Sequence, residues 1–189
     1  MVLGIAAAAA VALYFSLVFF VFPQYQMETR RPEAVVTDIA ISKSEIALGQ
    51  SFTVTVTGTN SGQHADMEIV SVGFPNLTRS DDITVLQHDF AQTTVMVNAG
   101  DQIGSGYSGT ATPVAAQYAS VEAFSRPWEG GRSYSISMEV TPETEGRFAV
   151  FVKAVAFPHS WDGAHWPSKG IVDHQQEFVQ VHYVEVTNP

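Results

Sequence analysis

Hydrophobic and polar residues alternate along much of the chain beyond residue 34, which is the period of a β-strand with one buried face. Residues 51–60, SFTVTVTGTN, place valines on one face and threonines on the other, and predict a half-buried antiparallel strand. Residues 134–140 and 177–186 follow the same rule, although a change of phase near Val184 predicts a bulge. Residues 147–157 are apolar on both faces and predict a central, covered strand.

Weaker alternation predicts further strands at residues 35–42, 66–74, 81–86 and 93–98, with glycine-containing turns between them. Residues 115–124 fit either a short helix or a strand. Eight or nine short strands separated by turns are typical of an antiparallel Ig-like β-sandwich. We therefore expect a mainly β domain over residues 37–189, preceded by a linker over residues 25–36.

The pattern is different at the start of the chain, where residues 2–22 carry no charge. A helix of this length matches the thickness of a bilayer core, and Pro23 would end it. A cleaved signal peptide is the alternative, but no basic residue precedes the run, and its alanines come first. We expect residues 1–24 to be a retained single-pass membrane anchor. By the positive-inside rule, Arg30 and Arg31 favour a cytoplasmic location for the domain that follows. The composition of that domain favours an extracytoplasmic location, and we give it more weight.

Composition points to an extracytoplasmic domain that does not bind nucleic acid. Nineteen acidic residues against nine basic ones give a formal charge of −10, which repels nucleic acid. The absence of cysteine excludes disulfides and the cysteine-based copper and iron–sulfur centres, and fits an exported prokaryotic protein. Asn76-Leu77-Thr78 is an N-glycosylation sequon, so Asn76 is a candidate glycosylation site on an exported chain.

Three of the six histidines, His159, His165 and His174, lie in a loop-like stretch together with Asp162 and Asp173. Imidazole and carboxylate could bind zinc or copper, but the wide spacing on a loop favours ordinary hydrogen-bonding histidines, and we expect no metal and no cofactor. We find no Gly-x-Ser-x-Gly and no ordered triad, so no catalytic residue is expected.

Three tryptophans, Trp128, Trp161 and Trp166, lie on predicted connections between strands. Tryptophan is enriched at the energetic centres of protein interfaces, so these residues are our candidates for contact with a partner. The alternative is that their large side chains close the open ends of the sandwich.

Two stretches carry a resemblance to a known family. Leu48-Gly49-Gln50, the alternating residues 52–56 and Asn60-Ser61-Gly62 resemble the first hairpin of Ig-like modules of the CARDB type, found in prokaryotic and especially archaeal cell-surface proteins. Pro142, Gly146 and Phe148 resemble the lead into a late strand of such modules. The resemblance covers about a third of the chain and implies architecture only.

The layout of an apolar helix before a β-sandwich is similar to that of archaeal pilins, archaellins and archaellum stator subunits. It implies a non-catalytic structural or interaction subunit of a cell-surface assembly or a membrane complex, with homo- or hetero-oligomeric partners. The same layout occurs in oxidase subunit II and in the copper-bearing subunit of ammonia and methane monooxygenases. A copper-associated accessory subunit of a membrane redox enzyme is therefore the alternative, although this chain lacks cysteine and a His-x-His pair.

Overall fold

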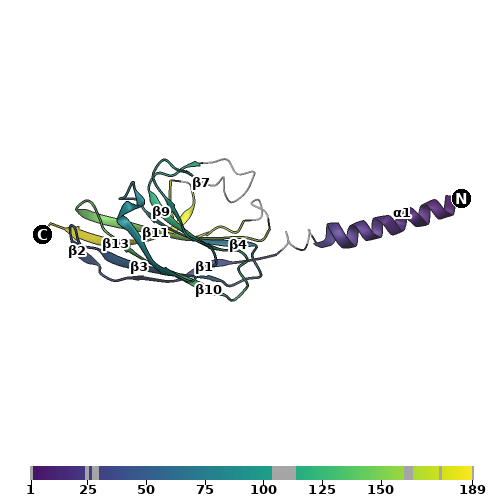
Figure 1. Ribbon diagram of the computed structural model, residues 1–189, viewed down its shortest axis with the longest axis horizontal. Coiled ribbons are helices and arrows are strands. Elements are labelled where there is room, and N and C mark those ends of the chain that lie inside the picture. Colours follow the sequence, from purple (N-terminus) through teal and green to yellow (C-terminus); the bar gives the residue numbers. More distant parts are fainter. Residues whose placement is uncertain are drawn as a thin grey trace.

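A computed structural model describes residues 2–23, 26, 30–103, 114–159, 164–174 and 176–188. The chain begins with α1 (Val2–Ser16), which continues into a π-helical segment, η1 (Leu17–Val21). This helical part lies beyond one end of the β-domain (Figure 1). Within the described ranges, no helix combines the length and the apolar character that crossing a membrane would require.

The β-domain is built on two main sheets. The first has the strand order β1 (Ala34–Ile41), β3 (Phe52–Asn60), β10 (Ser133–Val140) and β5 (Ile83–His88). The second has the order β12 (Ile171–Val172), β13 (Phe178–Thr187), β11 (Gly146–Phe157), β4 (Met67–Phe74), β9 (Ala119–Ser125) and β6 (Val95–Val97). A short strand, β2 (Glu45–Ala47), pairs with β13, and a small ribbon joins β7 (Gln102–Ile103) and β8 (Val114–Ala115). A 3₁₀ turn, η2 (Ser80–Asp82), leads into β5.

Strand pairing confirms the mainly β prediction and adds detail to it. The ambiguous stretch at residues 115–124 contributes most of strand β9, which pairs with β4 and β6. The β2–β13 pairing is parallel, so the larger sheet is mixed rather than purely antiparallel. The bulge predicted near Val184 is wrong, because β13 pairs with β11 in unbroken register from Gln180 to Val186. The change of phase arises because β13 buries Val179 on one face and Val184 and Val186 on the other.

One hydrophobic core lies between the two main sheets. The smaller sheet contributes Val54, Val56, Ile136 and Met138, and the larger one contributes Val70, Val72, Val150 and Val152. Trp128, which is fully buried, packs edge-to-face against Phe90 and Tyr134 at one end of this core. Its burial corrects the expectation that Trp128 contacts a partner: the side chain closes the sandwich and offers no surface.

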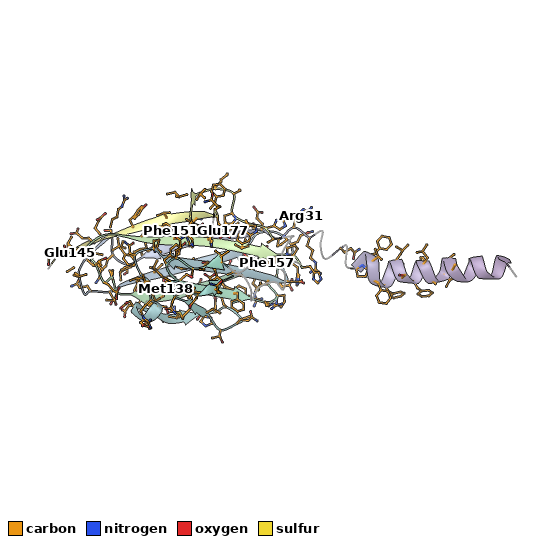
Figure 2. The ribbon with its side chains drawn as sticks, turned by 90° about the horizontal axis from the view of Figure 1, so that it is seen from above. Arg31, Met138, Glu145, Phe151, Phe157 and Glu177 are labelled. Carbon is orange, nitrogen blue, oxygen red and sulfur yellow. The ribbon has the colours of Figure 1, made fainter. Side chains whose placement is uncertain are left out.

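The domain begins slightly before the predicted boundary, because strand β1 starts at Ala34. The residues just before it are fastened to the β3–β4 turn through backbone bonds between Arg31 and Gln63 and between Glu33 and Ser61. Arg31 and Phe157 lie at the end of the sandwich nearest the helix, and Glu145 lies at the opposite end (Figure 2). The chain therefore enters the sandwich through a hydrogen-bonded junction.

Candidate functional site

The segment that joins β11 to β13, residues 158–177, runs along the outer face of the larger sheet, the face turned away from the core. The histidine-rich stretch noted in the sequence lies here, and the structure describes all of the segment except residues 160–163 and 175. Three separate groups of contacts hold the described part against the domain. Each group includes one of the three histidines that the sequence singled out, or a residue next to it in the chain.

The first attachment is an ionic cluster at the end nearest the helix. His159 Nδ1 lies 2.7 Å from Asp66 Oδ2, and Arg30 Nη1 donates to Asp66 Oδ1 at 2.9 Å. His64 completes the cluster, with Nε2 3.3 Å from Asp66 Oδ1 and Nδ1 2.9 Å from Glu129 Oε1. Partial burial acts to raise the pKa of Asp66, but the hydrogen bond and charge of His159, with Arg30 and His64, lower it below its ordinary value. Asp66 thus joins the chain entrance to the start of the segment.

The second attachment is a backbone bridge followed by an aromatic contact. Ala156 and His165 exchange two backbone hydrogen bonds, of 3.1 and 2.7 Å. Burial and the positive charge of Arg31 lower the pKa of His165, which favours its neutral form. Trp166 then packs edge-to-face on Phe157, with ring centroids 6.4 Å apart. Phe157 belongs to a second apolar cluster, with Met67, Ile69 and Val155, that covers this part of the outer face.

The third attachment is a carboxylate–lysine cluster formed by Glu122, Lys153, Asp173 and Glu177. Lys153 and Glu122 flank Ser71 in one row across β11, β4 and β9. Glu122 Oε1 accepts hydrogen bonds from the hydroxyls of Ser71 at 2.8 Å and Ser120 at 3.0 Å. From the segment above, Glu177 forms an ion pair with Lys153, and Asp173 Oδ2 lies 3.5 Å from Lys153 Nζ.

Two opposing effects set the pKa values in this cluster: the cost of burying a charged group and the attraction between opposite charges. Burial acts to lower the pKa of Lys153, but the charges of Glu177, Glu122 and Asp173 outweigh it and raise the pKa. For the carboxyl group of Glu122 burial has the opposite effect and raises the pKa. The charge of Lys153 and the hydrogen bonds from Ser71 and Ser120 reduce this rise but do not cancel it. The raised pKa keeps Lys153 an ammonium ion at neutral pH, the form that pairs with Glu177 and Asp173. The chemistry available to this cluster is ion pairing, which pins the segment.

Tyr118 and His174 cover one side of the cluster. The Tyr118 hydroxyl donates to Asp173 Oδ2 at 3.5 Å, and its ring meets the His174 ring edge-to-face at 4.9 Å. Burial, reinforced by the nearby Asp173, raises the pKa of Tyr118, so the hydroxyl stays protonated. Neither ring nitrogen of His174 has a hydrogen-bond partner within the described part of the chain.

Between the second and third attachments the segment presents apolar side chains to the outside. Trp166 is 40% exposed, Ile171 56% and Val172 46%. Ile171 and Val172 form β12, the edge strand of the larger sheet. Gly170 precedes them with φ +135°, and a Cβ there would overlap the carbonyl oxygen of Val179. The glycine lets the segment lie directly on β13. We call the exposed Trp166, Ile171 and Val172 the edge patch.

The three candidate metal ligands serve three different attachments. His159 contacts Asp66, His165 pairs with Ala156, and His174 packs on Tyr118. Among the described residues there is no group of three or more histidine, aspartate or glutamate side chains placed to hold a metal ion. Asp162 lies outside the described residues.

The other residues that the sequence singled out are the three tryptophans, as partner contacts, and Asn76, as a glycosylation site. Trp166 is half-exposed in the edge patch, Trp128 is buried, and Trp161 lies outside the described residues. Asn76 is exposed, and its side-chain oxygen accepts the Ala149 amide at 2.7 Å. Its glycosylation stays a prediction.

Sequence reasoning missed the carboxylate–lysine cluster. Two of its members do leave a signal: Lys153 interrupts the apolar run of residues 147–157, and Glu122 stands between Val121 and Ala123. A lone charge inside a covered strand is costly without a partner. Pattern alone could not identify the partners, because they come from another strand and from a loop.

Comparison with known proteins gives structural neighbours only. No family model and no curated protein matches the chain. The chain is similar to the CARDB domain of a Pyrococcus furiosus protein, solved in complex with di-metal ions, at 10% identity and a TM-score of 0.42, covering 82% of this chain and 89% of that one. CARDB modules are the class that the sequence resembles.

Two further structures illustrate how general the likeness is. The chain is similar to a cohesin module of a Clostridium perfringens family 33 glycoside hydrolase, at 9% identity and a TM-score of 0.39, covering 85% and 100% of the two chains. It is also similar to a Listeria innocua β-glucosidase, at 16% identity and a TM-score of 0.38, covering 84% of this chain but 16% of the enzyme. Scores of this size carry no inference about activity.

Proposed function

We propose that this chain is a membrane-anchored, extracytoplasmic β-sandwich that acts without catalysis, as an interaction subunit of a cell-surface assembly or a membrane complex. The observation that carries the proposal is the exposed apolar helix. Phe20 is 73% exposed, Tyr14 63% and Leu13 62%, on a helical run that lies beyond the end of the sandwich. Exposed apolar surface is costly in water, at about 25 cal/mol per Å². A lipid environment for residues 2–22 would remove that cost.

The surface proposed for partner contact is the edge patch. An edge strand with exposed apolar residues has unpaired backbone groups and apolar area available to a second chain. Three attachments fix this patch on the domain, so little conformational entropy is lost when a partner binds. Trp166 is the best candidate for the central contact, because it is the largest side chain of the patch and is half-exposed.

Vesicle flotation tests the anchor. The full chain should float with phosphatidylcholine vesicles, and Leu13→Lys combined with Phe20→Lys should leave most of it in the soluble fraction. Ile171→Lys combined with Val172→Lys is the matched control, because it adds the same two charges at exposed apolar positions of the sandwich. Equal flotation of the helix variant and the wild-type chain would refute membrane anchoring through residues 2–22.

Cysteine labelling tests the topology. Because the natural chain has no cysteine, Glu145→Cys creates a single reactive thiol at the end of the domain away from the helix. A membrane-impermeant maleimide should label this variant in intact cells as fully as after lysis. Labelling that appears only after lysis would place the domain in the cytoplasm.

The size of the complex tests partner contact. After solubilisation from its native membrane, the wild-type chain should elute with partners, as a species larger than the 20.5 kDa monomer in its micelle. Trp166→Ala should shift most of the chain to the monomer position, while Tyr183→Ala, a comparably exposed aromatic change on β13, should not. Wild-type chain that is already monomeric would refute the interaction role.

A further inference from the structure

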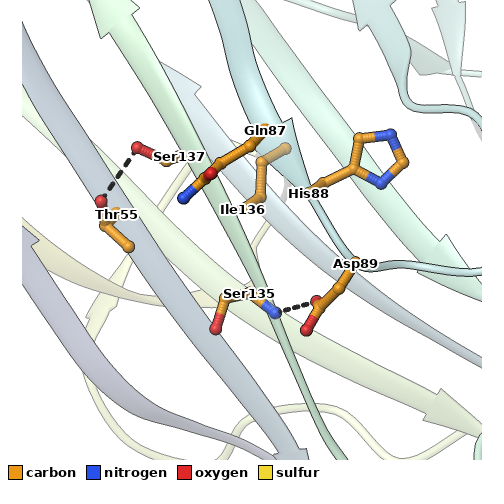
Figure 3. A pocket seen from close by; sticks show the side chains of 7 residues that line it. All are labelled: Thr55, Gln87, His88, Asp89, Ser135, Ile136 and Ser137. Atoms are coloured by element: carbon orange, nitrogen blue, oxygen red, sulfur yellow. Dashed lines mark hydrogen bonds between the residues drawn. The ribbon is translucent and has the colours of Figure 1, made fainter.

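A polar pocket of about 250 Å³ opens on the outer face of the four-stranded sheet (Figure 3). It lies where β5 and β10 lose register between Ser137 and Met138. The lining comes from the end of β5 and the residue after it, from β10 and from Thr55 on β3. The lining residues are Thr55, Gln87, His88, Asp89, Ser135, Ile136 and Ser137.

The pocket continues a row of paired hydroxyl groups along the two central strands. Thr55 lies opposite Ser137, Thr57 opposite Ser135 and Thr59 opposite Ser133. Their side-chain oxygens are 3.1, 2.8 and 2.7 Å apart. A hydrogen bond between two hydroxyls uses one hydrogen and leaves the other available, together with free lone pairs on both oxygens. Thr55 donates to Ser137, so Ser137 still has its own hydrogen to offer.

Planar polar side chains border these hydroxyls. The Gln87 amide lies over β10 beside Ser137, and Asp89 lies beside Ser135 (Figure 3). Asp89 Oδ1 accepts the backbone N–H of Ser135 at 2.5 Å, which fixes the orientation of the carboxylate. Gln87 and Asp89 are both exposed, so the polar atoms that they do not use within the chain are accessible to a ligand, whereas the His88 ring points away from the other lining side chains (Figure 3). The lining thus offers closely spaced donors and acceptors on a fixed backbone.

Charge narrows the class of ligand. Among the described residues that line the pocket there is no lysine or arginine, and Asp89 is the one carboxylate; the whole chain carries a formal charge of −10. An anion would meet repulsion without a compensating cation. An apolar ligand would leave the hydroxyls and the amide without partners, at a cost for each group. The fitting ligand therefore carries no negative charge and has several hydroxyl groups of its own.

We propose that this pocket binds a neutral saccharide, with the ring hydroxyls bonded to Ser135, Ser137, Gln87 and Asp89. The volume lies below the range of about 300–1,000 Å³ typical of pockets for drug-sized ligands, which suits one sugar unit. The hydroxyl row beyond the pocket would contact neighbouring units of a longer glycan. This site does not depend on membrane anchoring or on the edge patch.

Saturation-transfer NMR on the full chain in phosphatidylcholine nanodiscs tests the proposal without glycoside detergent. The probes are methyl β-glucoside, methyl α-mannoside and methyl β-galactoside, with glucuronate as the anionic comparison. At least one neutral glycoside should receive saturation from the protein, and glucuronate should bind at least tenfold more weakly. Absence of transfer to all three neutral probes, or equal binding of glucuronate, would overturn the proposal.

Variants assign the signal to the pocket. Gln87→Leu should weaken binding about fivefold, since one hydrogen bond of ordinary strength is lost, and Ser137→Ala should do the same. Thr84→Leu is the matched control on the same strand, outside the lining, and should bind as the wild-type chain does. Gln87 is exposed at a sheet edge, so its variant keeps the fold. Unchanged binding in Gln87→Leu and Ser137→Ala would show that the sugar contacts another surface, and would overturn the assignment.

Discussion

Asn60 and Trp128, which are 68 residues apart in the chain, are joined by a 3.1 Å hydrogen bond from Asn60 Nδ2 to the Trp128 carbonyl oxygen. The same amide donates to Gln63 O at 2.7 Å, and its oxygen accepts the N–H groups of Glu33 and Gly62, each at 3.0 Å. One fully buried side chain therefore joins the domain entrance, the β3–β4 turn and the turn that holds Trp128.

Asn60→Asp should lower the free energy of unfolding by about 3–5 kcal/mol. A carboxylate of the same shape cannot donate, so the carbonyls of Gln63 and Trp128 both lose a buried partner. Urea unfolding followed by tryptophan fluorescence measures the change. Asn76→Asp, at an exposed position, is the control and should cost under about 1 kcal/mol. Similar losses for the two variants would contradict the role assigned to Asn60.

Lys153→Met should destabilise the domain by about 3–5 kcal/mol and release the β11–β13 segment. The change keeps the apolar stem but leaves Glu122, Asp173 and Glu177 without their common cation. Limited proteolysis within residues 158–177 reports the release, and urea unfolding reports the stability. In the control, Arg79→Met, the ion pair that is lost is with Asp81 on the surface, and we expect almost no effect. A segment that stays protease-resistant in Lys153→Met would contradict the pinning.

Gly170→Ala should lift the start of β12 from β13. The new Cβ would overlap the Val179 carbonyl oxygen, which belongs to a paired strand and cannot move aside. Gly49→Ala is the control for a positive φ without overlap, because Gly49 has φ +84° and faces open space. Amide exchange at Ile171 and Val172 should accelerate in the Gly170 variant only. Unchanged exchange at Ile171 and Val172 in Gly170→Ala would contradict the overlap.

Glu68→Gln should stabilise the chain at alkaline pH and leave it nearly unchanged at pH 4. Glu68 is fully buried, neither of its oxygens has a hydrogen-bond partner among the described residues, and burial raises its pKa from 4.5 to about 8. Because the folded state binds this proton more tightly than the unfolded state, the contribution of Glu68 to stability is highest below about pH 4.5. It falls as pH rises from there to about 8 and is level above, with a total loss of up to about 5 kcal/mol. A pH-independent difference between the variant and the wild-type chain would show that Glu68 is not neutral when folded.

The sequence pattern predicted the strands whose hydrophobic and polar residues alternate. It did not predict the contacts between residues that are far apart in the chain. Strands β3 and β10 follow directly from alternating valine, isoleucine and hydroxyl residues, and β11 from apolar residues on both faces. Residues 115–124 stayed ambiguous because alanine and glutamate favour helices. Most of these residues form a strand because they pair with β4, and tertiary packing outweighs local propensity.

The candidate site shows the same division. The sequence drew attention to the histidine-rich stretch, and the segment that contains it, residues 158–177, does carry the exposed Trp166. Histidine spacing could not show that His159, His165 and His174 serve three attachments, because their partners Asp66, Ala156 and Tyr118 are set by the fold. Trp128 looked like a surface residue because it lies between strands, yet its indole N–H donates to Arg132 O at 2.7 Å and its ring fills the core.

The two ends of the chain lie at opposite ends of the long axis of the molecule (Figure 1). Strand β1 enters from the helix side and pairs with β3, while β13 leaves at the far end, held by β11 on one side and by β2 on the other. A pulling force between a fixed N-terminus and a load at the C-terminus would act along these strands. It would shear several backbone hydrogen bonds at once instead of opening them one by one. A domain connected in this way is suited to bearing tension, with a lifetime under load set by its unfolding rate rather than by its equilibrium stability.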